Sequence, residues 1–321
     1  MDLSNCKYLT ETPIFNCIPN LERLDCTGCS NLLKVHPSIG HLTNLVFLSL
    51  QNCSSLVNLD FGSDSNLSSL RVLLLSGCTK LEKTPDFTGA SNLAYLDIDG
   101  CTSLFKVHES IEALSKLRFL SLRDCTNLVG QPNSVNTMSS LEILDLSGCF
   151  KLTTLPLENI SFGESLGKGY SAKFRLIFID LSFCKLEQVP DAIGGLCWLE
   201  RLNLQGNNFD SLPSSINNLI HLTYLNLAHC HKLQTFPQLT RMSKPPLSFY
   251  PQVTPQQGRY FKKRSGSRDY RSGLYIFDCP NIKFCKEQSL EYFGGHERSE
   301  WIRTLFAVCT LHMLPLYFSF S

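Results

Sequence analysis

The chain has 321 residues and carries 29 Lys and Arg against 28 Asp and Glu, a formal net charge of +1. Such a balance gives no global electrostatic field that would attract nucleic acid or an anionic membrane, so any recognition by charge must be local. The N-terminus has no basic stretch followed by an apolar run, and we therefore predict no signal peptide.

One phrase recurs from residue 1 to residue 239, and it is clearest as LEILDLSGCFKLTTLP at residues 141–156. Its leucines follow the spacing LxxLxL, in which the last two alternate as a one-sided strand requires, and a cysteine stands three residues further on. The equivalent cysteines are Cys6, Cys29, Cys53, Cys78, Cys101, Cys125, Cys149, Cys184 and Cys230, and Asn207 takes this position in one unit. A period of 23 to 25 residues, broken only by a gap of 35 after Cys149, is typical of leucine-rich repeats.

The repeats predict an α/β repeat solenoid, a leucine-rich-repeat horseshoe with a parallel β-sheet on its concave face and short helical or extended return segments. About ten units, the first of them partial, occupy residues 1–239. We expect a basic, Pro-rich linker at 240–273 and an incomplete post-repeat β-rich segment with an irregular tail at 274–321. The extra residues around 158–173 should leave the stack as a loop. Because the first unit starts in mid-strand, we expect a piece of a longer protein.

Fifteen cysteines would suggest a disulfide framework in a short secreted protein, but nine of them are explained by the repeat register. A buried cysteine behaves as a small hydrophobic residue with a weak S–H donor, which suits the position that Asn207 fills with an amide. Parallel side chains on adjacent rungs hold their Cβ atoms farther apart than a relaxed disulfide allows, so we predict no disulfides along this ladder.

The leucines point into the solenoid, so the residues between them face the concave surface. The residue before the second leucine is aromatic or arginine in most units, types that dominate interface hot spots, and an acidic or amide residue follows that leucine. We predict a protein-binding face made of Arg23, Phe47, Tyr95, Asp97, Phe119, Arg123, Asp145, Phe178, Arg201 and Tyr224, centred on Phe47, Tyr95, Phe119 and Arg123. The alternative is that these rows only stabilise the sheet through contacts between neighbouring rungs.

The sequence contains no HExxH or Walker motif, and Gly167-Lys168 lacks the spacing of a phosphate loop. The letters GxSxG occur at residues 163–167, but they lie in the stretch expected to leave the stack as a loop and not in the strand–turn–helix that this motif needs. We predict neither a cofactor nor an enzymatic activity. His229-Cys230-His231 invites a metal site, but Cys230 occupies the buried repeat position and we expect its neighbours to point elsewhere, so we predict no metal. The uncharged run from Thr304 to Phe320 is marginal for spanning a bilayer, and core material is the favoured interpretation.

The phrases NLERLDCTGCSNLLKVHPSIGHLTNL (20–45) and SLEILDLSGCFKLTTLP (140–156) resemble the repeats of plant intracellular disease-resistance receptors of the TIR-NBS-LRR class, and GLYIFDCPNI (273–282) is similar to the phrase that follows those repeats. The resemblance implies a non-catalytic sensing and autoinhibition module. Its partner would be a pathogen effector, a guarded host protein or the receptor's own nucleotide-binding domain. The resemblance also implies a cytoplasmic or nuclear protein whose nucleotide-binding and NADase parts lie outside this chain.

Two other classes of protein stay open at this point. A scaffold of leucine-rich repeats without an immune role would share the concave aromatic row. A cell-surface receptor anchored through Thr304 to Phe320 would be glycosylated, and Asn66-Leu67-Ser68 and Asn159-Ile160-Ser161 match the acceptor triplet. Matches to this short triplet also occur by chance in proteins that are not glycosylated.

Overall fold

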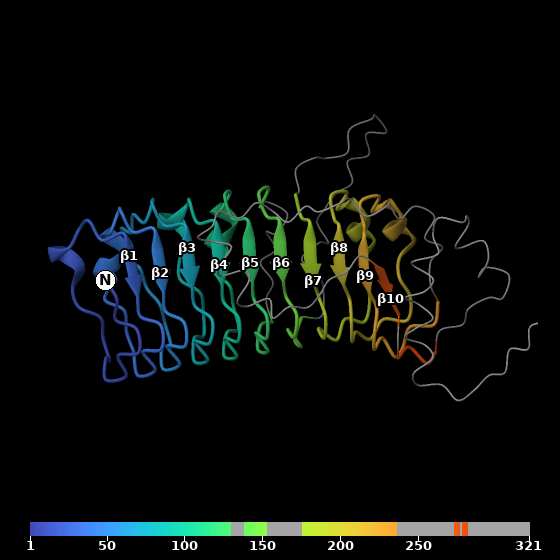
Figure 1. The fold of residues 1–321 in the computed structure, drawn as a ribbon, viewed down its shortest axis with the longest axis horizontal. Coiled ribbons are helices and arrows are strands. Elements are labelled where there is room, and N and C mark those ends of the chain that lie inside the picture. Colours follow the sequence, from blue (N-terminus) through green and yellow to red (C-terminus); the bar gives the residue numbers. More distant parts are fainter. Residues whose placement is uncertain (130–137, 153–174, 236–272, 277, 282–321) are drawn as a thin grey trace, which may run out of the picture.

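The computed structural model describes residues 1–129, 138–152, 175–235, 273–276 and 278–281, and these build one elongated stack of rungs (Figure 1). A ten-stranded sheet runs through them in the order β1 to β10. The strands are β1 (Arg23–Asp25), β2 (Phe47–Ser49), β3 (Val72–Leu74), β4 (Tyr95–Asp97), β5 (Phe119–Ser121), β6 (Ile143–Asp145), β7 (Phe178–Asp180), β8 (Arg201–Asn203), β9 (Tyr224–Asn226) and β10 (Gly273–Tyr275). The predicted leucine-rich-repeat solenoid is confirmed.

Every strand pairs in parallel with the next, and the register follows the repeat. Leu48 pairs with Leu24 on one side and with Leu73 on the other, and the same match continues along the sheet. β6 pairs directly with β7, so the stack continues across the long gap in the repeat period. β10 adds to β9 with Gly273 opposite Tyr224, so the described part of the segment after the repeats extends the same sheet. The predicted loop around 158–173 lies outside the described residues.

The core is one continuous apolar stripe made of the repeated leucines. In the phrase at 141–156, Leu141, Leu144 and Leu146 are all 2% exposed or less, and Cys149 is fully buried. Each rung covers the leucines of its neighbours, which is why a repeat of this kind is stable only in a stack.

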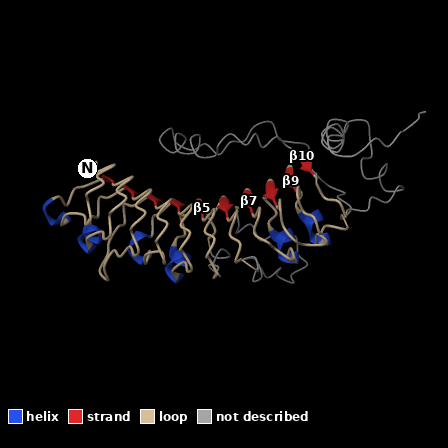
Figure 2. Cartoon of the chain, turned by 90° about the horizontal axis from the view of Figure 1, so that it is seen from below, coloured by secondary structure: helices blue, strands red, loops and turns tan. Residues whose placement is uncertain are grey.

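The return segments form short 3₁₀ helices on the convex side, while the strands line the inner side of a shallow arc (Figure 2). The helices are η1 (Phe15–Cys17), η2 (Pro37–His41), η3 (Thr88–Ala90), η4 (Glu109–Ala113), η6 (Asp191–Gly195) and η7 (Ser214–Asn218). His36 and His108 begin two of them, since the Nδ1 atom of each ring accepts a hydrogen bond from the backbone N–H two residues later at 3.2 Å. This capping role explains why the two histidines recur at equivalent positions.

The residue before each repeat cysteine turns the chain out of the strand with a positive φ angle. Examples are Gly28 at 78°, Gly77 at 77° and Gly148 at 74°. Glycine adopts this left-handed conformation without strain, and Asn and Asp are the commonest substitutes. Rungs without glycine carry Asn5, Asn52, Asp124, Phe183, His229 or Asp278 at this position.

Candidate functional site

The predicted aromatic row lies in register across the concave sheet. The sheet pairs Phe47 with Val72, Val72 with Tyr95, and Tyr95 with Phe119. The rings of Tyr95 and Phe119 stack with their centroids 4.2 Å apart and their planes 2° from parallel. The guanidinium of Arg23 lies 3.6 Å from the centroid of Phe47, a cation–π contact at the N-terminal end of the row.

A small second core forms on the concave side of the sheet. Phe47, Leu74 and Tyr95 are its buried members, and Val72 and Phe119 pack against them. Phe47 is 7% exposed and Tyr95 is 8% exposed. Aromatic side chains that stack in this way hold neighbouring strands together, and in this structure Phe47 and Tyr95 are almost wholly buried. Leu74 also belongs to this cluster. It stands where most units carry an acidic or amide residue after the second leucine, and it was not among the predicted site residues.

The acidic and amide row has a definite structural role. Asp145 Oδ1 accepts hydrogen bonds from the N–H of Ser147 at 2.9 Å and from its hydroxyl at 2.6 Å. Asp180 makes the same pair of contacts with Ser182, and Asp97 accepts from the N–H of Asp99 at 3.1 Å. Such side-chain turns satisfy the backbone where each strand ends. Asp97 and Asp145 therefore stabilise the rungs whether or not a partner binds.

Several carboxylates lie close together between β4 and β7, beside Arg123. Burial raises the pKa of Asp99 to about 7, and the neighbouring charge of Asp97 adds to the shift. Burial also raises the pKa of Asp145 to about 6, with a further contribution from Asp180. Arg123, which forms an ion pair with Asp124 at 3.4 Å, opposes both shifts. Asp99 was not among the predicted site residues, although its place in the repeat register puts it on this face.

The remaining predicted residues are spread along the sheet. Arg23 pairs with Asp25 at 3.1 Å on the first strand. Phe178 and Arg201 are partly buried and lie opposite each other on β7 and β8, and Tyr224 follows on β9 at 5% exposed. The predicted residues thus lie in neighbouring rows that run from β1 to β9, with none on β3 and with Tyr95, Phe119 and Arg123 near the middle.

The repeat cysteines form a ladder of free thiols. Each ladder thiol from Cys29 to Cys230 donates to a backbone carbonyl of the preceding rung, at the position of the last leucine in the LxxLxL spacing. For example, Cys125 donates to Ile98 O at 3.2 Å, and Cys149 donates to Leu122 O at 3.1 Å. Cys279 lies outside the predicted repeats at 1–239, but its thiol joins this ladder by donating to Leu227 O at 3.1 Å. Burial raises the pKa of Cys184 to about 12, so these thiols are poor nucleophiles and poor metal ligands.

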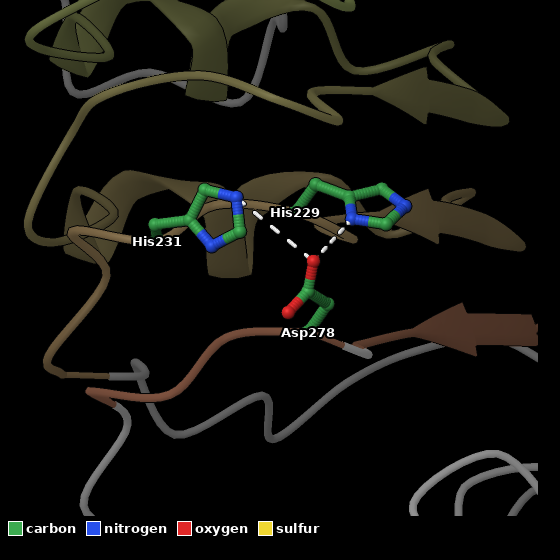
Figure 3. Close-up of side chains that lie close together, drawn as sticks. All are labelled: His229, His231 and Asp278. Atoms are coloured by element: carbon green, nitrogen blue, oxygen red, sulfur yellow. Dashed lines mark hydrogen bonds and ion pairs between the residues drawn. The ribbon is translucent and has the colours of Figure 1, made fainter. Parts of the chain in front are cut away.

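His229 and His231 depart from the sequence-based expectation. Cys230 is buried as predicted, but the two flanking imidazoles both turn toward Asp278 (Figure 3). His229 Nδ1 lies 2.7 Å from Asp278 Oδ2, and His231 Nε2 lies 3.9 Å from the same oxygen. The expectation that these side chains point elsewhere was wrong because it did not foresee a further rung, β10, stacked on β9.

Comparison with known proteins identifies the repeats. Residues 198–219 match the Leucine Rich Repeat family. The chain is 32% identical over 295 residues to the TMV resistance protein N of Nicotiana glutinosa, an alignment that covers 74% of this chain and 24% of that protein. It is 37% identical over 213 residues to the disease resistance protein RPS6 of Arabidopsis thaliana, covering 64% of this chain and 18% of that protein. The chain is a leucine-rich-repeat relative of plant disease-resistance proteins.

The resemblance to the TIR-NBS-LRR class is thus confirmed by relatives aligned over most of the repeats. This leucine-rich-repeat chain spans about a quarter or less of the length of the curated relatives it matches. Its fold is also that of the leucine-rich-repeat domain of the type III effector XopL, with a TM-score of 0.53, 22% identity, and coverage of 68% of this chain and 72% of that one. Within the described ranges, no helix is long and apolar enough to cross a membrane.

Proposed function

We propose that this chain is a non-catalytic protein-recognition module of a plant immune receptor. The observation that carries the proposal is the in-register concave row in which Tyr95 stacks on Phe119 and Arg23 lies over Phe47. Aromatic and arginine side chains held on a rigid sheet are the groups that most often dominate protein interfaces. The disease-resistance relatives give the biological setting.

The partner that fits this surface is a protein. The row extends over many strands, a shape suited to a long or curved protein surface. In a full-length receptor, the partner would be a pathogen effector or guarded host protein in the active state, and the receptor's own nucleotide-binding domain in the autoinhibited state. The proposed place of action is the cytoplasm or the nucleus.

Any NADase or nucleotide-binding activity of the whole receptor would belong to other domains. The first test is to sequence the transcript and genomic region upstream of Met1. A reading frame that continues into repeat halves and a GxxxxGK[ST] phosphate loop would support the receptor assignment, whereas a promoter directly upstream would favour a scaffold without an immune role.

The second test is co-precipitation of the 321-residue chain with the nucleotide-binding domain that the proposal expects the upstream reading frame to encode. The proposal predicts a complex that survives washing and that forms with the folded chain only. The absence of binding to that domain, together with unchanged cell death when the chain is deleted from the full receptor, would contradict both the recognition and the autoinhibition role.

A further inference from the structure

The turns after β9 and β10 carry His229 and Asp278 at equivalent positions of adjacent rungs, and both are residue types that can bind a metal ion. His229 and Asp278 each precede the ladder cysteine, and they have φ angles of 59° and 55°. In the other adjacent pairs at least one of the two residues is glycine, which leaves room for its neighbour: an added Cβ at Gly148 would lie 2.3 Å from Asp124 Oδ1. The His229–Asp278 pair has no glycine, and the two side chains meet directly.

His231 adds a third donor from the other side of the ladder cysteine. The donor atoms of His229, His231 and Asp278 all lie within 4.8 Å of one another. Metal bonds of about 2.0–2.2 Å in a tetrahedral site separate neighbouring ligand atoms by about 3.3 Å. The observed separations of 2.7 Å and 3.9 Å from Asp278 Oδ2 lie on either side of that value, so small rotations of the side chains would bring all three onto one ion.

We propose that His229, His231 and Asp278 bind one Zn²⁺ ion that fastens the segment after the repeats to the last repeat. Two imidazole nitrogens and one carboxylate oxygen are a donor set that suits zinc and other borderline transition ions, while Ca²⁺ and Mg²⁺ select oxygen donors. The fourth position of the ion stays open to water. Cys230 lies between the two histidines in sequence but is buried and donates to Leu204 O at 3.3 Å, so it is not a ligand.

The site would act as a clip at the C-terminal end of the stack. Its ligands come from residues 49 positions apart in the chain (278 − 229). Two further contacts already join the same rungs: Cys279 donates to Leu227 O at 3.1 Å, and Asn281 Nδ2 donates to His231 O at 2.7 Å. Closing a long loop with a metal restricts the unfolded and the partly detached states more than the folded one, so zinc would hold β10 on β9.

The simpler interpretation is an ion pair between His229 and Asp278 alone. That pair needs one histidine, and it gives no reason for His231 to face the same oxygen. The two interpretations differ in what they predict for His231. Replacing this residue should weaken zinc binding by at least about tenfold if the three side chains form one site, and it should leave a simple ion pair between His229 and Asp278 unchanged.

The test is zinc binding by the full 321-residue chain, freed of metal with a chelator and titrated against a chromophoric zinc indicator. We expect one Zn²⁺ per chain with micromolar or tighter affinity, and a loss of at least about tenfold in affinity in His231→Asn and in Asp278→Asn. Asparagine tolerates the positive φ of residue 278, so the second variant should fold. His221→Asn, which changes another exposed histidine nearby, is the matched control and should bind zinc normally.

Two further readouts separate this site from the thiols. Co²⁺ in the same chain should give a visible ligand-field spectrum without an intense sulfur-to-metal charge-transfer band. Zinc should slow hydrogen exchange in β10 of the wild type and of His221→Asn, but not in His231→Asn or Asp278→Asn. A charge-transfer band, equal affinity in all variants, or no binding at micromolar zinc would each overturn the proposal. The result is independent of the proposed immune function, because the test needs no protein partner.

Discussion

At the scale of single residues, Asn207 and the ladder cysteines solve the same problem with different chemistry. Asn207 Nδ2 donates to Leu181 O and to Leu204 O, both at 2.8 Å, and its Oδ1 accepts from Leu186 N at 3.0 Å. A cysteine at this position makes one weak bond to the preceding rung, as Cys125 does with Ile98 O. The asparagine therefore satisfies three buried backbone groups where the thiol satisfies one.

This difference predicts unequal costs of truncation. Asn207→Ala should lower the free energy of unfolding by about 3 kcal/mol, because three buried polar groups lose their partner, and Cys125→Ala should lower it by about 1 kcal/mol. Urea unfolding followed by circular dichroism measures both values. Equal losses in the two variants would show that the side-chain amide contributes nothing beyond filling space.

The raised pKa of Asp99 makes the stability depend on pH. The folded chain keeps this carboxyl protonated up to about pH 7, whereas the unfolded chain releases the proton near the ordinary value of 3.8. The stabilisation that protonation gives is complete below the unfolded pKa and is lost as the pH rises through about 7. Asp99 is only partly buried, so solvent reduces the effect.

We therefore expect Asp99→Asn to gain about 1 kcal/mol of stability relative to the wild type between pH 5 and pH 8. The amide oxygen can keep the acceptor role toward the Ser121 hydroxyl and toward Arg123 N. Thermal unfolding across this pH range is the measurement, and Asp64→Asn, at an exposed position, controls for the loss of one charge. Parallel pH profiles for the wild type and Asp99→Asn would contradict a raised pKa.

At the scale of the element, the turn after each strand contains a residue with positive φ that lies beside the same residue of the neighbouring rung. Gly100 has a φ of +66° and open space around an added Cβ, whose nearest atom would be Gly77 N at 4.0 Å. Gly148 has a φ of +74°, and its added Cβ would lie 2.3 Å from Asp124 Oδ1. The two glycines share the backbone requirement and differ in their neighbours.

Gly100→Ala should cost about 1 kcal/mol from backbone strain, and Gly148→Ala should cost about 1 kcal/mol more from the contact with Asp124. The double variant Gly148→Ala/Asp124→Gly removes the contact and should lose only as much as Gly100→Ala. Unfolding midpoints in urea compare the three variants. If the double variant were no more stable than Gly148→Ala, Asp124 would not be the source of the extra cost.

At the scale of the whole molecule, the sequence predicted the solenoid because its core consists of one repeated contact. The spacing of Leu141, Leu144 and Leu146 determines which side chains are buried, and the same spacing in every unit determines the register of the sheet. The aromatic row followed from this register. The sequence could not show that Tyr95 stacks on Phe119, because stacking depends on side-chain rotation.

The metal-binding cluster was missed for a different reason. Residues 236–272 separate the last sequence-defined repeat from β10, so the repeat period did not predict that Asp278 would lie beside His229. The sequence does contain an indication of this rung: Asp278 precedes Cys279 as His229 precedes Cys230, and both cysteines belong to the ladder. The pair of a turn residue and the ladder cysteine that follows it, taken without the leucine spacing, predicts this rung.

The measurement that tests the central proposal most directly is the affinity of the chain for the nucleotide-binding domain of the proposed full-length receptor. We expect the variant Phe119→Ala/Arg123→Ala, which leaves the buried Phe47 and Tyr95 in place, to remain folded by circular dichroism and to lose at least about tenfold in affinity. The matched control replaces the exposed residues Phe105 and Trp198, which lie outside the strands, and it should bind like the wild type. Full affinity in the folded concave variant would contradict the assignment of the concave row as the binding surface.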